Sequence, residues 1–215
     1  MNNHVKKNRA VYLLGMVGSM LFITTSLVGG WLIKDYNLLN QLISETYAID
    51  TEYGLILRWL GFIPSGVLLV FFCFLSADYF KSSAWTKVGF YGIGIFYGLA
   101  TVIVSIFPCD SGCNKEWMDP SISQMIHNLT GFLTYLTVPF LIMLIGFSTR
   151  RPTNNGFSNL SITIGVFSFV MVALLLVNIN TEFIGLYQRM IESSFLLWVM
   201  ACASILKKSV DDSKS

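Results

Sequence analysis

Six long apolar stretches run along this chain, and short polar segments separate them. The stretch VFSFVMVALLLV at 166–177 is continuously apolar, whereas the strands of a membrane barrel alternate between polar and apolar residues. A helix needs about 20 apolar residues to cross a bilayer core of ~30 Å. The pattern therefore predicts an all-α fold, a polytopic transmembrane bundle of six helices forming one membrane domain over 1–215, with spans at 10–33, 54–77, 88–107, 126–147, 160–177 and 183–206.

Composition supports a membrane protein. Apolar residues make up 54% of the chain and charged residues only 12%, against about one quarter charged in soluble domains. The mean hydropathy is +0.64. The glycine-rich stretches GMVGSM (15–20) and GFYGIGIFYG (89–98) predict faces where helices approach one another closely, because small residues permit such contact in membranes.

The distribution of basic residues predicts the orientation. Cytoplasmic loops of membrane proteins carry an excess of Lys and Arg, so the ends and loops that carry this excess should face the cytoplasm. Both termini are therefore expected in the cytoplasm, in a cell membrane and most consistently a bacterial inner membrane. Ten of the 14 basic residues fall on that side: Lys6, Lys7, Arg9, Lys81, Lys87, Arg150, Arg151, Lys207, Lys208 and Lys214.

The first outward loop, at 34–54, carries apolar residues at the spacing of a short helix. Leu38, Leu39, Leu42 and Ile43 would share one side of that helix. Such an amphipathic segment is expected to lie on the membrane surface.

The second outward loop holds two cysteines. Cys109 and Cys113 would face the oxidising side, where disulfides persist, so a Cys109–Cys113 disulfide is predicted. A zinc site that also uses Asp110 and His127 is the alternative, but the C-x-x-x-C spacing matches no standard zinc knuckle. His127 is also explained as a hydrogen-bonded residue at a helix start.

Familiar catalytic and cofactor motifs are not found in the sequence. A transmembrane bis-imidazole haem needs two histidines inside the membrane, and His127 is the only one near a span. We find no phosphate-binding glycine loop, no G-x-S-x-G and no HExxH. No cofactor or metal is predicted, and no aromatic and basic pattern indicates nucleic acid.

The last span carries the segment YQRMIESSF at 187–195, although a charge at the centre of a span costs about 2.5–3.5 kcal/mol. Arg189 and Glu192 could neutralise each other as neighbours on one helix face, while Arg58 extends to the headgroups. Alternatively, the polar residues of the outer leaflet converge on one pocket, as intramembrane ionisable residues often do at functional sites. The pocket would comprise Arg58, His127, Gln188, Arg189, Glu192, Asp110 and Glu45.

Two guanidinium groups in such a pocket favour phosphate or carboxylate ligands. The sequence thus predicts a membrane protein that binds or moves an anionic lipid headgroup or a small acid. Two alternatives stay open. One is an accessory or assembly subunit whose charges are structural, and the other is a membrane enzyme acting on lipid headgroups, with a metal in the loop between Cys109 and His127.

Four motifs together resemble a known family. They are NLLNQLISETYA, FPCDSGC, IHNLTG and GLYQRMIESSFLLW. Their order and spacing resemble the six-helix bacterial membrane family known as domain of unknown function 998, and similarity to the DRAM group of six-span proteins is weaker. ETYA departs from the Leu and Gly expected after SE. The resemblance implies a six-span fold and recurring positions at Ser44, Glu45, Cys109, Asp110, His127, Gln188 and Arg189.

Overall fold

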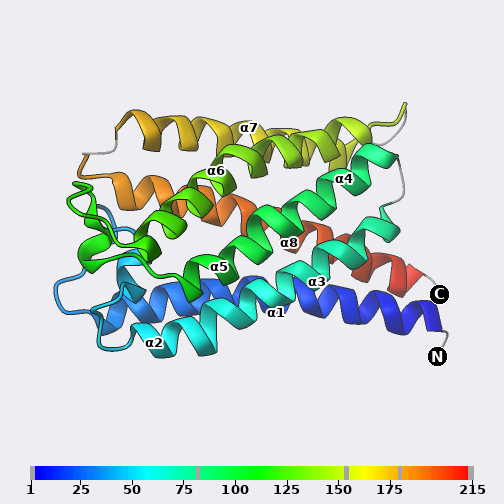
Figure 1. Cartoon of the computed structure of the whole chain (residues 1–215). Helices are drawn as coiled ribbons and strands as arrows, with labels where there is room; N and C mark the ends of the chain where they lie inside the picture. The colour runs from blue at the N-terminus through cyan, green and yellow to red at the C-terminus, as the bar shows by residue number, and fades with distance from the viewer. Residues whose placement is uncertain (1–2, 81–82, 153–154, 179–180, 213–215) are drawn as a thin grey trace.

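Six apolar helical columns build the protein (Figure 1). The computed structural model describes residues 3–80, 83–152, 155–178 and 181–212, and this part contains helices, turns and loops but no strand. The predicted all-α bundle of six membrane-spanning helices is confirmed. The stretches long and apolar enough to cross a bilayer are Asn8–Leu32, Gly54–Tyr79, Ala84–Ile106, Ile122–Ser148, Gly156–Val177 and Ile184–Lys207, and their ends lie within four residues of the predicted ones.

Four columns are single α-helices, and two are divided by a π-helical turn. The single helices are α1 (Asn3–Leu32), α6 (Ile122–Ser148), α7 (Gly156–Val177) and α8 (Ile184–Asp212). The second column runs through α2 (Gly54–Ile56), the π-helix η2 (Leu57–Phe62) and α3 (Ile63–Tyr79). The third runs through α4 (Ala84–Ile93), the π-helix η3 (Gly94–Leu99) and α5 (Ala100–Ile106).

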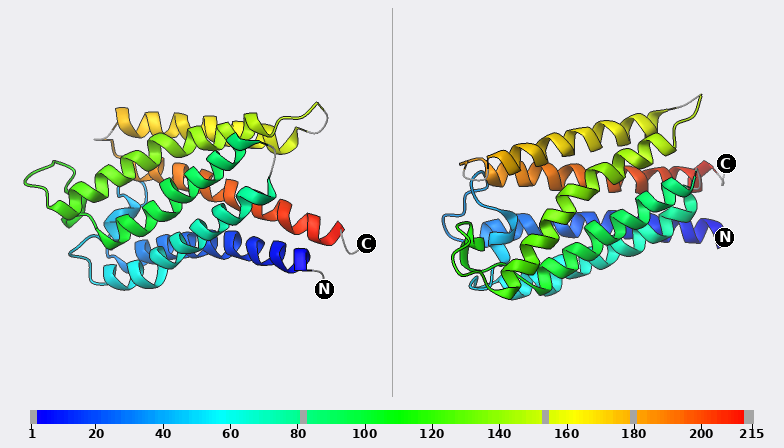
Figure 2. Two further views of the ribbon diagram at one scale, coloured as in Figure 1. Left: turned by 45° about the vertical axis from the view of Figure 1, so that its right-hand side comes forward. Right: turned by 45° about the horizontal axis from the view of Figure 1, so that its top comes forward.

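The six columns form a closed bundle, because the last helix, α8, packs against both the first helix, α1, and α7. Helix α8 is the most enclosed column, with 56% of its apolar window buried, whereas α7 has only 28% buried and lies at the edge. Both termini lie at one end of the bundle, and the connections before α2 and α6 lie at the other (Figure 2). Of the basic residues counted for orientation, the side chains of Lys6, Lys7, Lys81, Lys208 and Lys214 lie outside the described part.

The end away from the termini carries two short 3-10 helices, η1 (Ile43–Tyr47) and η4 (Ser111–Asn114). All five residues of η1 are buried, so the expected amphipathic helix on the membrane surface is wrong. Leu38 and Leu39, which were to anchor it, precede the helix and are each 46% exposed. The segment packs into the bundle because its backbone finds hydrogen-bond partners on α8, as described below.

Close packing at the glycine-rich segment of the third column is borne out by the geometry. A β-carbon on Gly98 would lie 2.8 Å from the Val70 backbone nitrogen and 3.1 Å from the Gly66 carbonyl oxygen. Backbone atoms cannot rotate aside, so α3 and η3 can approach this closely only with glycine at the contact.

We therefore expect Gly98→Ala to destabilise the protein by about 1–3 kcal/mol, as overpacking does elsewhere. Gly131→Ala is the matched control, since no atom lies within 4 Å of a β-carbon there. Thermal unfolding in mild detergent measures both. An unchanged melting temperature for Gly98→Ala would contradict the close contact.

Candidate functional site

A cavity of about 280 Å³ lies inside the bundle at the end away from the termini. Residues of α1, η1, η3, α5, α6, α7 and α8 line it, together with the segment that follows the disulfide. Most of these residues are apolar or aromatic. Polar side chains from α6 and α8 face them, which is the composition of a binding site for a small molecule.

Glu192 is the carboxylate among the residues that line this cavity. It lies two turns into α8 and is only 8% exposed. The hydroxyl of Tyr97 donates to Oε2 at 3.0 Å, and the hydroxyl of Tyr135 donates to Oε1 at 2.8 Å. Both tyrosines line the cavity. The carboxylate is thus held by two neutral donors, and no Lys or Arg within the described ranges forms an ion pair with it.

The local structure of the third column places Tyr97 here. Tyr97 belongs to the π-helix η3 and is 2% exposed. A π turn rotates the following residues relative to a regular α-helix, and such turns are frequent at functional sites. Thr101, one turn later, donates its hydroxyl to the Tyr97 carbonyl at 2.8 Å. The widened turn therefore keeps its backbone oxygen satisfied while the phenol reaches α8.

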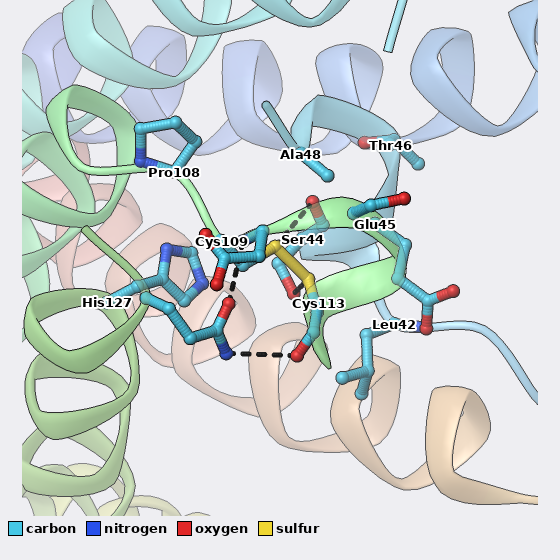
Figure 3. Close-up of a disulfide and its surroundings, with 12 residues drawn as sticks. Leu42, Ser44, Glu45, Thr46, Ala48, Pro108, Cys109, Cys113 and His127 are labelled. Atoms are coloured by element: carbon cyan, nitrogen blue, oxygen red, sulfur yellow. Dashed lines mark hydrogen bonds between the residues drawn. A yellow bond between two sulfur atoms is a disulfide. The ribbon is translucent and has the colours of Figure 1, made fainter. Parts of the chain in front are cut away.

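His127 also lines the cavity and is 8% exposed. Its Nδ1 lies 3.1 Å from the Val104 carbonyl oxygen and 3.0 Å from that of Phe107. Since carbonyls only accept, Nδ1 carries the proton. In the neutral ring Nε2 is then an acceptor, and no other described residue hydrogen-bonds to it. Figure 3 shows the ring beside the disulfide loop.

Arg189 does not pair with Glu192 in the described part of the chain, so mutual neutralisation, one of the two alternatives considered for this helix, is wrong. Its Nη1 donates to the carbonyls of Leu38, Gln41 and Gly185 at 2.8, 2.7 and 2.9 Å. Helical side chains lean toward the N-terminus of their helix, so this guanidinium reaches the loop beside the start of α8. Its charge is met by carbonyl dipoles.

Tyr36 completes the surroundings of Arg189. Nη2 of Arg189 donates to the Tyr36 hydroxyl at 2.6 Å, and that hydroxyl donates to the Leu42 carbonyl at 2.6 Å. The guanidinium carbon also lies 5.5 Å from the centre of the Tyr36 ring. Burial raises the pKa of the Tyr36 phenol, so the phenol keeps its proton at neutral pH.

Gln188 contributes to the same connection. Its Oε1 accepts from the Ile43 backbone N–H at 2.6 Å, and the Leu186 N–H donates to the Leu39 carbonyl at 2.9 Å. Together with Arg189, these bonds hold η1 and the turn before it against α8. Gln188 also lines the cavity, so the residue that holds η1 also forms part of the wall.

Arg58 and Glu45 lie away from the cavity lining. The Nε of Arg58 donates to the Gly54 carbonyl on its own column at 3.2 Å. Glu45 accepts from the Leu42 backbone N–H at 2.8 Å and forms an ion pair with Lys115 at 2.7 Å. Lys115 does line the cavity, on the segment after η4. Glu45 therefore contacts two lining residues, Leu42 and Lys115, without lining the cavity itself.

The predicted Cys109–Cys113 disulfide is present (Figure 3). Gln124 of α6 bridges its loop, accepting from the Asp110 backbone N–H at 2.7 Å and donating to the Cys113 carbonyl at 2.9 Å. The hydroxyl of Ser44 on η1 lies 3.2 Å from the Cys113 sulfur. The disulfide loop is thus fixed to both α6 and η1 at the edge of the cavity.

Asp110 binds Ser121, the N-cap residue of α6, and is not part of the lining. Its carboxylate accepts from both the hydroxyl and the backbone N–H of Ser121, and these bonds lower its pKa. The zinc arrangement considered for this loop is wrong, because Cys109 and Cys113 are joined to each other. Among the described residues, no group of three or more His, Cys, Asp or Glu is placed to hold a metal ion.

Three of the seven predicted site residues therefore line one cavity: His127, Gln188 and Glu192. Arg58, Arg189, Asp110 and Glu45 do not. Sequence reasoning missed Tyr97 and Tyr135, the two partners of Glu192. A buried carboxylate needs donors, and a tyrosine inside an apolar span is a candidate donor, but nothing in the sequence indicates which tyrosines these are.

The comparisons with known proteins show the family. The family described as Protein of unknown function (DUF998) matches residues 16–205, and the chain belongs to it. No curated protein and no solved structure matches the chain significantly.

We expect Arg189→Ala to lower the free energy of unfolding by roughly 2–4 kcal/mol, because several hydrogen bonds from a charged donor are lost. Arg151→Ala, at an exposed site in a loop near the other end, is the control and should have almost no effect. Thermal unfolding of both variants in the same detergent measures the difference. Equal melting temperatures would contradict the structural role of Arg189.

Proposed function

We propose that this protein is a membrane binding protein that holds one small, mainly apolar molecule in the cavity between its helices. The proposal also places it in a cell membrane, such as a bacterial inner membrane, with both termini in the cytoplasm. The cavity then belongs to the outer half of the bilayer. The observation that carries the proposal is a partly open, largely apolar and aromatic cavity with the partly satisfied Glu192 carboxylate in its lining.

The size and lining of the cavity support a small ligand. Its volume of about 280 Å³ is near the lower end of the ~300–1,000 Å³ typical of ligand pockets. A molecule with an apolar body would contact the walls, and its polar group would meet Glu192, His127 or Gln188.

The position of charges supports the orientation. The described basic residues Arg9, Lys87, Arg150, Arg151 and Lys207 lie in the first turns of α1 and α4, just after α6, and in the last turns of α8. These helix ends lie with the termini (Figure 1), and an excess of such residues is typical of the cytoplasmic side. The disulfide belongs to the connection between α5 and α6, which lies at the opposite end (Figure 1), where an oxidising compartment would preserve it. The two observations agree on one orientation.

The anionic ligand expected from the sequence depended on Arg58 and Arg189. Neither guanidinium lines the cavity, and both donate to backbone carbonyls. We therefore propose a ligand that is not recognised through these arginines. The alternative of an accessory subunit assumed that the charges of this protein are structural. The contacts of Arg189 with the segment before η1 support such a structural role for this one charge.

Gly131 offers a direct test, because it lines the cavity and no atom lies within 4 Å of a β-carbon placed there. We expect Gly131→Phe to fill the cavity and abolish ligand retention without lowering stability. Leu129→Phe is the control, since this residue lies on the same helix and is 61% exposed.

Native mass spectrometry of gently extracted protein is the measurement. Wild type and Leu129→Phe should carry the same small-molecule adduct, and Gly131→Phe should carry none. An adduct retained equally by all three proteins would place the ligand elsewhere. A wild type without any adduct, which no small amphiphile stabilises against heat, would refute the binding function itself.

A further inference from the structure

Glu192 is the negative charge of the cavity, and the basic side chains around it are already engaged. Arg189, on the same helix, donates to three carbonyls and Tyr36. Arg58 donates to Gly54, and Lys115 pairs with Glu45. The cavity thus contains a carboxylate without a cationic partner among the described residues, and a buried charge of this kind is costly unless it is paired.

The hydrogen-bond donors nearest to Glu192 are also engaged. Tyr97 and Tyr135 each donate their single hydroxyl proton to the carboxylate. Thr101 and Thr134 donate to backbone carbonyls of their own helices. A carboxylate has about four lone-pair sites, so two remain on Glu192. These two sites can accept N–H groups from a ligand.

His127 extends this set of acceptors. Its Nδ1 proton is directed to the Val104 and Phe107 carbonyls, and Nε2 of the neutral ring is an acceptor on a residue of the cavity wall. The side chains of Tyr47 and Asn128 also line the cavity and make no hydrogen bond with another described residue. They can bind a second polar group of the ligand.

The aromatic wall favours a cation as well. Phe22, Tyr47, Tyr97, Trp117, Phe132 and Tyr135 all line the cavity. The faces of aromatic rings attract ammonium groups, by about 0.5–1 kcal/mol at exposed sites and about 2 or more where water is excluded. Tyr47, Tyr97 and Tyr135 thus place aromatic surface in the same cavity as the Glu192 carboxylate, a combination that suits an ammonium ion.

We propose that the polar group of the ligand is an amine, bound as an ammonium ion against the Glu192 carboxylate, with its apolar body against the aromatic wall. This inference rests on the proposed binding function and specifies the chemical class of the ligand. The ammonium N–H groups donate to the two free lone-pair sites of Glu192. The ligand is thus a small amphipathic amine rather than an anion.

Three probes with the same alkyl chain test this class: hexylammonium, 1-hexanol and hexanoate. Binding to the full-length protein in nonionic detergent is measured by isothermal titration calorimetry at neutral pH. We expect hexylammonium to bind at least about tenfold more tightly than 1-hexanol, as a charge-assisted hydrogen bond provides, and hexanoate to bind most weakly. The Gly131→Phe variant, in which the new side chain is expected to fill the cavity, is the control. The heat measured with it is due to partition of each probe into the micelle and is subtracted.

Two variants test whether Glu192 is the residue that causes the preference for hexylammonium. Glu192→Gln keeps the shape of the side chain but removes its charge, so hexylammonium and 1-hexanol should then bind within about twofold of each other. Glu182→Gln, at an exposed carboxylate just before α8, should keep the wild-type preference. Should Glu192→Gln fail to fold, the order of the three probes on the wild type still decides the question.

The outcomes separate the two proposals. If 1-hexanol or hexanoate binds the wild type as tightly as hexylammonium, the amine is wrong and the binding function stands. If Glu192→Gln folds and keeps the preference for the amine, the assignment to Glu192 is wrong. If no probe and no cellular molecule occupies the wild-type cavity, the binding function fails as well.

Discussion

A charged side chain placed inside a membrane bundle is stabilised by partners within the protein, and helix α8 shows how this requirement organises the cavity. Water is not available there to replace a missing hydrogen bond. Gln188 and Arg189 find their partners on the backbone around η1, whereas Glu192, one turn deeper, finds Tyr97 and Tyr135. Helix α8 thus holds η1, which forms part of the cavity wall, and supplies the carboxylate of the cavity.

The rest of the cavity's outer end follows from the position of η1. Once α8 holds this segment, Ser44 meets the disulfide and Glu45 meets Lys115. Gln124 joins the disulfide loop to α6, and Asp110 binds Ser121, the N-cap residue of the same helix. Each contact satisfies a polar group that would otherwise be costly to bury. Together these contacts join η1, the disulfide loop and Lys115 to one another and to α6 and α8 at the outer end of the cavity.

The length of the apolar stretches was sufficient to predict the six helices, because about 20 apolar residues in a helix match the thickness of the hydrocarbon core. Cysteine spacing and compartment predicted the disulfide. The idea that Arg189 pairs with Glu192 was wrong, because two residues on one helix face can each bind other partners. The long arginine side chain extends toward the start of the helix and donates to carbonyls of the preceding loop. Tyr97 and Tyr135 escaped prediction because their encounter with Glu192 depends on how three distant helices pack, including the π turn η3.

The central claim is that the two charges of α8 are used separately, and a double-mutant cycle measures this most directly. Arg189→Ala, Glu192→Gln and the combined variant are unfolded under identical conditions in detergent. We predict that the two single effects add to within about 0.5 kcal/mol, because the two neighbouring side chains bind different partners and form no ion pair with each other. A double variant more stable than this sum by over about 1 kcal/mol would show that the two charges neutralise each other, and would contradict the account.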